Sequence, residues 1–267
     1  MTRAAPIRAA LRWSAAGLGL AGAAYATYVG MAWSRYGHPP RPARPEDQDE
    51  LLDRFMPVYE VGGCHHARVM APAAITLAAA REMDLRQLPI ARALFRAREL
   101  VLGSKPDDRP RPRGLLDDMR GLGWGVLAEI PDREIVVGAV TRPWEANVVF
   151  RSLPPDEFAA FHEPGYVKIA WTLRADPLGA AASMFRTETR AAATDPSARA
   201  RFRWYWSVFS PGMMLIRRAS LGPLTREAER RACQAATAEG NRADGQAASG
   251  RQGSRSAQRR GRSSVRV

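Results

Sequence analysis

The chain has 267 residues, enough for one or two domains, and its apolar fraction of 46% is that of a globular protein. The net charge of +13 would suit an anionic partner, but +6 lies in the first 45 residues and +5 in the last 34, which leaves +2 for residues 46–233. Arginine makes up 38 of the 40 basic residues, and the body has no basic helix or RNA-reading motif, so we expect no specific nucleic-acid partner.

An uncharged segment near the N-terminus, residues 13–33, matches the length of a helix that spans a bilayer. Trp13 and Trp33 stand at its two ends, and Arg12 and Arg35 lie just outside, as residues at a membrane interface do. The segment therefore predicts a transmembrane helix.

A cleaved signal peptide is the competing interpretation of this segment. Residues 24–26 form a cleavage site of the A-x-A kind, but no compact Leu-rich stretch precedes it. Length and flanking residues favour an uncleaved, single-pass anchor. The positive-inside rule leans toward a cytoplasmic N-terminus, so we expect a membrane protein with its main domain on the non-cytoplasmic side.

Composition divides the chain into four segments. Residues 1–36 are the expected membrane anchor, and residues 37–50 form a Pro-rich tether that should be extended. Residues 51–233 carry the apolar patterns of a folded domain. Residues 234–267 combine Ser, Gly, Gln and Arg without apolar periodicity, which predicts a disordered basic tail.

The body should contain both strands and helices. In chain order, the expected elements are a strand (64–70), two helices (73–83 and 88–103), a helical turn (115–123), a hairpin (124–140), a short helix (154–165), two strands (166–177 and 185–195) and a C-terminal helix. Gly103 should end the second helix, and Asp195 should cap the C-terminal helix. Pro211 and Gly212 should kink or break that last helix.

Several apparent motifs do not predict chemistry. Cys64, His65 and His66 are adjacent on a strand, so their side chains alternate between faces and cannot easily converge on a metal ion. The glycines of residues 121–125 open a strand, whereas a phosphate-binding loop opens a helix. No catalytic motif occurs, so we assign no catalytic residue, metal or cofactor.

The stretch FRTETRAAATD, residues 185–195, places Arg186, Glu188 and Arg190 on one face of a strand. If this face is buried, the glutamate needs arginine partners, and the row would form the polar wall of a ligand site. If it is exposed, the row is a solvated ladder that adds little stability. The rarity of buried charged residues favours exposure.

Three tryptophans are further candidates for a ligand site. Trp144 and Trp171 lie on or near strands, and Trp206 belongs to the apolar stripe of the C-terminal helix. Core packing is the usual role of such residues, but they also line ligand cavities between a sheet and a helix.

The order of these elements, with the string RVMAPAAITLAAA, resembles the helix-grip superfamily. The string FRTETRAAATDPSARARFRWYWSVFSPGMMLIRR (residues 185–218) resembles the C-terminal half of an uncharacterised bacterial family that is similar to this superfamily. This superfamily includes START, Bet v 1 and polyketide-cyclase-like (SRPBCC) proteins. The resemblance covers residues 51–230 and implies an α+β fold, in which an antiparallel sheet wraps around a long C-terminal helix. It also implies a cavity for a hydrophobic ligand.

We therefore expect a membrane-tethered carrier or binding domain for a small hydrophobic or amphipathic ligand such as a lipid. The candidate ligand-binding residues are Trp144, Trp171, Arg186, Glu188, Arg190 and Trp206. Two alternatives stay open: a cyclase- or hydrolase-type enzyme that uses Glu188 in a pocket, and a scaffold that binds partners through its basic tail. The sequence leaves the oligomeric state open.

Overall fold

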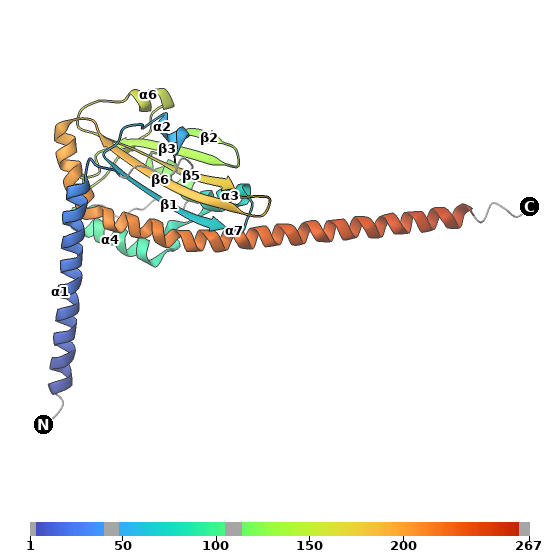
Figure 1. Cartoon of the computed structure of the whole chain (residues 1–267), viewed down its shortest axis with the longest axis horizontal. Coiled ribbons are helices and arrows are strands. Elements are labelled where there is room, and N and C mark those ends of the chain that lie inside the picture. Colours follow the sequence, from blue (N-terminus) through green and yellow to red (C-terminus); the bar gives the residue numbers. More distant parts are fainter. Residues whose placement is uncertain (1–3, 40–47, 105–113, 262–267) are drawn as a thin grey trace, which may run out of the picture.

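The computed structural model describes residues 4–39, 48–104 and 114–261 and shows an α+β fold built on an antiparallel sheet. The strands are β1 (Val61–Val69), β2 (Gly125–Ile130), β3 (Glu134–Thr141), β4 (Phe150–Arg151), β5 (Val167–Pro177) and β6 (Ser183–Ala193). They lie in the order β1-β6-β5-β3-β2, with β4 paired to β3 (Figure 1). The order places β1 beside β6, so segments far apart in the sequence become neighbours.

Helices cover both faces of the sheet. They are α1 (Ala4–Arg35), α2 (Glu50–Asp53), α3 (Ala73–Glu82), α4 (Pro89–Leu102), α5 (Leu115–Leu122), α6 (Pro155–Ala160) and α7 (Pro196–Gly261), with a 3-10 turn at Leu85–Gln87. The inner face packs on α3 and α7 through a buried cluster that includes Trp171 and Leu224. The outer face lies under α2 and α6, where Leu52 and Phe158 are buried (Figure 1). The sheet and the long C-terminal helix are the arrangement that the helix-grip resemblance predicted.

Local signals in the sequence predicted several boundaries correctly. Gly103 ends α4 in the left-handed conformation, with φ of 66°. Asp195 caps α7, because its Oδ1 accepts hydrogen bonds from the amides of Ser197 (2.8 Å) and Ala198 (3.1 Å). The predicted hairpin is formed by β2 and β3. The two-residue strand β4 was not predicted, because it is too short to show an alternating pattern.

The C-terminal helix bends but does not break at the predicted position. Before the bend, Val208 lies beside α1, and its carbonyl accepts a hydrogen bond from Tyr25 Oη at 2.6 Å. After the bend, Met214 lies against Gly63 of β1 (Figure 1). Pro211 lies between these contacts and has no amide to donate to the preceding turn, which accounts for the change in direction.

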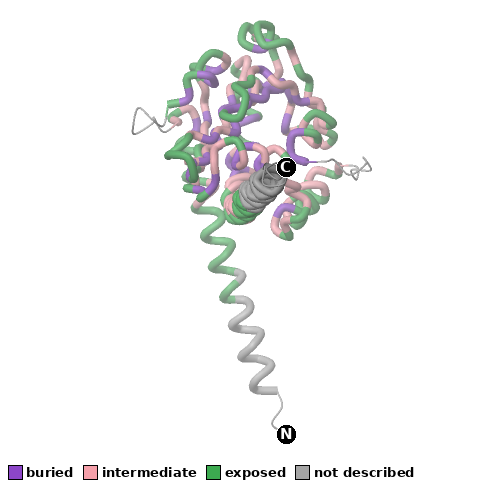
Figure 2. The backbone as a smooth tube through the Cα atoms, turned by 90° about the vertical axis from the view of Figure 1, so that its right-hand side faces the viewer, coloured by how far each residue is buried: buried purple, intermediate pink, exposed green. Residues whose placement is uncertain are grey.

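The N-terminal helix α1 is attached to the body at its C-terminal end. Tyr36 is buried with Phe202, and its hydroxyl donates to Glu60 Oε2 at 2.9 Å. The carbonyl of Trp33 accepts from Arg203 Nη2, also at 2.9 Å. Residues 19–27 of α1 are exposed (Figure 2).

Among the described residues, no helix, α1 included, combines the length and the hydropathy that a membrane span requires. The predicted transmembrane helix therefore has no support, and the membrane location stays a prediction.

The predicted disordered tail is helical over most of its length. The helix α7 continues to Gly261, well beyond the sheet (Figure 1). Apolar periodicity reports packing, whereas the alanines, arginines and glutamines of this segment have good intrinsic helix propensity without packing on the body. Most of the predicted extended tether, residues 40–47, lies outside the described residues.

A buried pair of hydroxyls joins α3 to the start of β6. Ser183 Oγ lies 2.8 Å from Thr76 Oγ1 and donates to the carbonyl of Ala71 at 2.9 Å. We expect Ser183→Ala to lower the free energy of unfolding by about 1–2 kcal/mol, because it leaves buried polar groups without partners. Urea denaturation would measure this. The double variant Ser183→Ala/Thr76→Val is the control, and a loss as large as the sum of both single losses would contradict the pairing.

Candidate functional site

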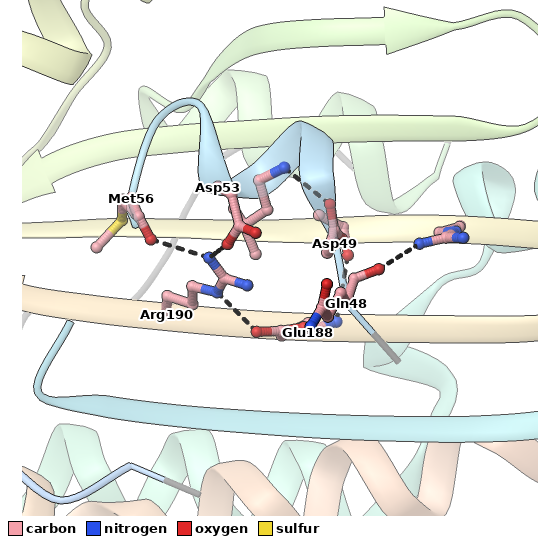
Figure 3. A network of polar contacts seen from close by, with 9 residues as sticks. Gln48, Asp49, Asp53, Met56, Glu188 and Arg190 are labelled. Atoms are coloured by element: carbon pink, nitrogen blue, oxygen red, sulfur yellow. Dashed lines mark hydrogen bonds and ion pairs between the residues drawn. The ribbon is translucent and has the colours of Figure 1, made fainter. Parts of the chain in front are cut away.

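The charged row of β6 lies on the outer face, where Glu188 and Arg190 are buried and Arg186 is half-buried. The exposed fraction is 2% for Arg190 and 8% for Glu188, so the prediction of a solvated ladder was wrong. The cover is a segment that we call the strap, residues 48–59, which contains α2 and runs across the outer face (Figure 3). A single strand cannot reveal such a cover, because the strap is more than a hundred residues away in the sequence.

Arg190 joins the strap to the sheet. Its Nε donates to Glu188 Oε1 at 2.7 Å, and its Nη1 donates to the carbonyl of Met56 at 2.9 Å and to Asp53 Oδ1 (Figure 3). The guanidinium also lies over the ring of Tyr59, 4.7 Å from the ring centroid. These contacts balance the charge of Arg190 and hold the C-terminal end of α2 and the residues after it against β6.

Arg186 belongs to a second charge cluster on the same face. Its Nε lies 3.4 Å from Asp176 Oδ2, and Arg174 Nε donates to Asp176 Oδ1 at 2.8 Å. Arg174 Nη1 also donates to the carbonyl of Gln48 at the start of the strap, at 3.0 Å. The row therefore does not act as one unit, since Glu188 pairs with Arg190 and Arg186 pairs with Asp176.

Two buried carboxyl groups meet under the strap. Asp49 and Glu134 are each 4% exposed, and Asp49 Oδ1 accepts from the amide of Leu52, which caps α2. Burial, followed by the nearby charge of Asp49 and the hydrogen bond with it, raises the pKa of Glu134 to about 8. Burial also raises the pKa of Glu188, and its hydrogen bond with Arg190 opposes that rise. We infer that Glu134 is the group that holds a proton at neutral pH.

The outer-face network works as a clamp that holds the strap. The enzyme hypothesis required the carboxylate of Glu188 to face a pocket between the sheet and the C-terminal helix. The structure places this carboxylate on the opposite face, beside Arg190 and beneath the strap (Figure 3). That hypothesis therefore loses the acid on which it depended.

The three candidate tryptophans lie on the other side of the sheet, with the inner-face clusters. Trp171 is buried on β5 and meets Trp124 edge-on, with ring centroids 6.3 Å apart. The rings of Trp206 on α7 and Phe202 have their centroids 6.0 Å apart, and Trp144 packs against the same buried cluster. The six predicted site residues are thus divided by the sheet, with the tryptophans on the inner side and the charged row on the outer side.

The inner face also carries polar atoms that sequence reasoning missed. Four buried side-chain atoms there have no hydrogen-bond partner among the described residues: His65 Nδ1, Thr189 Oγ1, Ser210 Oγ and Arg217 Nη1. His65 and Thr189 come from neighbouring strands, and Ser210 and Arg217 come from α7. A buried polar atom without a partner is unusual in a folded protein and points to a bound water, ion or ligand.

The register places Thr189 and His65 on the face of the sheet that packs on α7. Thr189 pairs with Trp171 on one side and with Gly63 on the other, so it faces α7 as Trp171 does. His65 is two residues beyond Gly63 on the same face of β1. Ser210 and Arg217 both belong to α7, on either side of the bend at Pro211. The sequence did offer one signal for this site: Arg217 follows the apolar stripe of α7 at helical spacing.

The middle of the inner face is less buried than its ends. Thr189, His65 and Arg217 are all half-buried, although they lie between the sheet and α7. Val69 and Phe185, near one end of the same strands, are buried. Ser210 is only 1% exposed, so three of the four residues are half-buried and the fourth is buried.

Two other features of the described residues do not add to this site. No three His, Cys, Asp or Glu side chains there are placed to hold a metal ion. An open depression of about 300 Å³ lies on α4 and is lined by Pro89, Arg92, Ala93 and Arg96. None of the candidate residues takes part in it.

Comparisons with known proteins give no family. No protein-family model and no curated protein matches the chain. Two similar solved structures are CalU16 from Micromonospora echinospora (12% identity, 65% of this chain and 86% of that chain, TM-score 0.22) and the Zhui aromatase/cyclase from Streptomyces sp. R1128 (15% identity, 64% and 94%, TM-score 0.22). TM-scores this low do not establish a shared function, so a function can be proposed only from the geometry of this chain.

Proposed function

We propose that the body of this protein binds a small amphipathic ligand between the inner face of the sheet and α7. The observation that carries the proposal is the group of four unpartnered polar atoms on His65, Thr189, Ser210 and Arg217. Aromatic and aliphatic side chains surround the same layer, including Trp171. A mostly apolar wall with a few convergent polar groups is the usual composition of a small-molecule site.

The proposal can be tested with the purified full chain and a neutral dye, N-phenyl-1-naphthylamine, whose fluorescence rises when it leaves water. We expect saturable binding of one dye per chain. Native mass spectrometry of the same preparation should show a bound small molecule that the dye displaces. Absence of both signals in the wild-type protein would reject the proposal.

Ser210 offers a matched pair of variants. Ser210→Ala removes the unpartnered hydroxyl and leaves space, so we expect dye affinity to stay close to that of the wild type. Ser210→Leu fills space beside the inner face, and we expect affinity to fall by about tenfold, which is 1.4 kcal/mol. Equal binding by both variants, each folded by circular dichroism, would place the dye elsewhere on the chain.

The other functions expected from the sequence have less support. Glu188 does not face the layer between sheet and helix, so the enzyme hypothesis has no acid at this site. Partner binding through the basic tail stays a prediction, as does a membrane tether. We make the present proposal for the body alone.

A further inference from the structure

We infer that the ligand carries an anionic group, a carboxylate or a phosphate, and that Arg217 binds this group. The inference rests on the proposed function, because it specifies the chemistry of a ligand in the same layer. It concerns Arg217 on α7, which is absent from the candidate site that the sequence suggested. Three observations carry it: the missing partner of Arg217, the donors around it and the position of the acids.

Arg217 lacks the partners that the other interior arginines have. Arg190 is bound by two carboxylates and a carbonyl, and Arg174 is bound by Asp176. Arg217 Nη1 is shielded from solvent without a hydrogen bond. Burial alone lowers the pKa of Arg217 to about 10, and no carboxylate of the described residues opposes the change. A guanidinium nitrogen that is shielded from solvent without a counter-charge is costly, and an anionic ligand would supply that charge.

The other inner-face residues with unpartnered atoms carry hydroxyls or an imidazole, and His65 lies near enough to Arg217 to feel its charge. Burial and the positive charges of Arg217 and Arg218 lower the pKa of His65 below its ordinary value of 6.5, so the imidazole is neutral at pH 7. The hydroxyls of Thr189 and Ser210 can each donate a hydrogen bond. A planar guanidinium with hydroxyl and imidazole donors suits the oxygens of a carboxylate or a phosphate.

The position of the acids supports the same conclusion. The acidic groups of the buried network, among them Glu188, Asp53 and Asp176, lie on the outer face and are already paired with arginine. The sheet separates them from Arg217. The arginines of the outer-face network are thus neutralised within the fold, whereas Arg217 Nη1 has no partner among the described residues.

The test compares two dyes that share an aromatic skeleton. 1-Anilinonaphthalene-8-sulfonate carries one anionic group that N-phenyl-1-naphthylamine lacks. We expect the wild-type protein to bind the anionic dye more tightly. Arg217→Met keeps much of the length of the side chain and removes the charge. We expect it to lower the affinity for the anionic dye by at least about tenfold and to leave the affinity for the neutral dye unchanged. Arg218→Met, at an exposed neighbouring position, should leave both affinities close to wild type.

The outcomes separate the two proposals. If the wild-type protein binds neither dye, the proposed function fails. If it binds the neutral dye but Arg217→Met does not reduce the preference for the anionic dye, the function stands and the role of Arg217 is overturned. If Arg217→Met does not fold, the affinities of the wild-type protein for dodecanoate, dodecyl phosphate and dodecanol are compared instead. We expect both anions to bind more tightly than dodecanol. Equal affinity for dodecanol would overturn the inference. The same series shows whether a carboxylate or a phosphate is preferred.

Stability without ligand gives an independent measurement. If Arg217 serves the ligand, Arg217→Met should melt at the same temperature as the wild type or higher, because it removes an uncompensated buried charge. Addition of dodecanoate should then raise the melting temperature of the wild type more than that of the variant. A lower melting temperature for ligand-free Arg217→Met, with equal shifts on addition of dodecanoate, would assign Arg217 to the structure of the apoprotein.

Discussion

Replacement of Arg190 by alanine is expected to lower the free energy of unfolding by about 3–5 kcal/mol, because it leaves buried charges without a partner. Arg190 is 2% exposed and bridges Glu188 of β6 to Asp53 and the carbonyl of Met56 in the strap. Loss of the side chain removes the ion pairs and also the cover that the guanidinium gives to Tyr59. Urea denaturation followed by tryptophan fluorescence would measure the change.

A surface ion pair provides the control for Arg190. Arg199 Nε lies 3.3 Å from Glu60 Oε1, and the Arg199 side chain is 55% exposed. We expect Arg199→Ala to lower the free energy of unfolding by less than about 1 kcal/mol, since water screens an exposed pair. Similar losses for Arg190→Ala and Arg199→Ala would show that the clamp contributes no more than a surface contact.

The free energy of unfolding is expected to fall as the pH rises from about 4.5 to about 8, because Glu134 ionises in the unfolded chain over this range but stays protonated in the folded protein. The pKa of Glu134 is raised from 4.5 to about 8 in the folded state, so the folded chain holds this proton more tightly than the unfolded chain does. The stabilisation is complete below pH 4.5 and is lost as the pH passes the folded-state pKa. We expect a loss of roughly 2–4 kcal/mol across this range.

Glu134→Gln should remove most of this loss, because the amide has the shape of the protonated acid and cannot ionise. The variant should therefore be more stable than the wild type above pH 8. Glu129→Gln on the neighbouring strand β2 is the control, because Glu129 lies at the surface in an ion pair with Arg81. Melting temperatures between pH 4 and pH 9 would measure the difference, and parallel curves for Glu134→Gln and wild type would refute the buried acid pair.

Local signals were enough to predict much of the fold. The alternation in residues 185–195 identified β6 and placed Arg186, Glu188 and Arg190 on one face. Asp195 and Gly103 marked helix ends correctly, because capping depends on a few neighbouring residues. Apolar periodicity failed for the end of α7, because a helix that extends beyond the body needs no apolar stripe.

The candidate site was less predictable, because its members come from distant parts of the chain. The tryptophans and the charged row looked like one site in sequence, yet the sheet separates them. Arg217 went unnoticed because its meaning lies in the lack of a partner, which a linear pattern cannot show.

The sequence by itself therefore determined the elements, their two-faced strands and the shared face of Glu188 and Arg190, since these depend on backbone geometry over a few residues. Only the tertiary structure decided that the strap covers this face, that Glu188 faces away from α7 and that Arg217 is left unpaired on the inner side. The physical reason is that burial and charge pairing are set by whichever distant segment packs on a face. The sequence of a strand alone does not indicate which segment that will be.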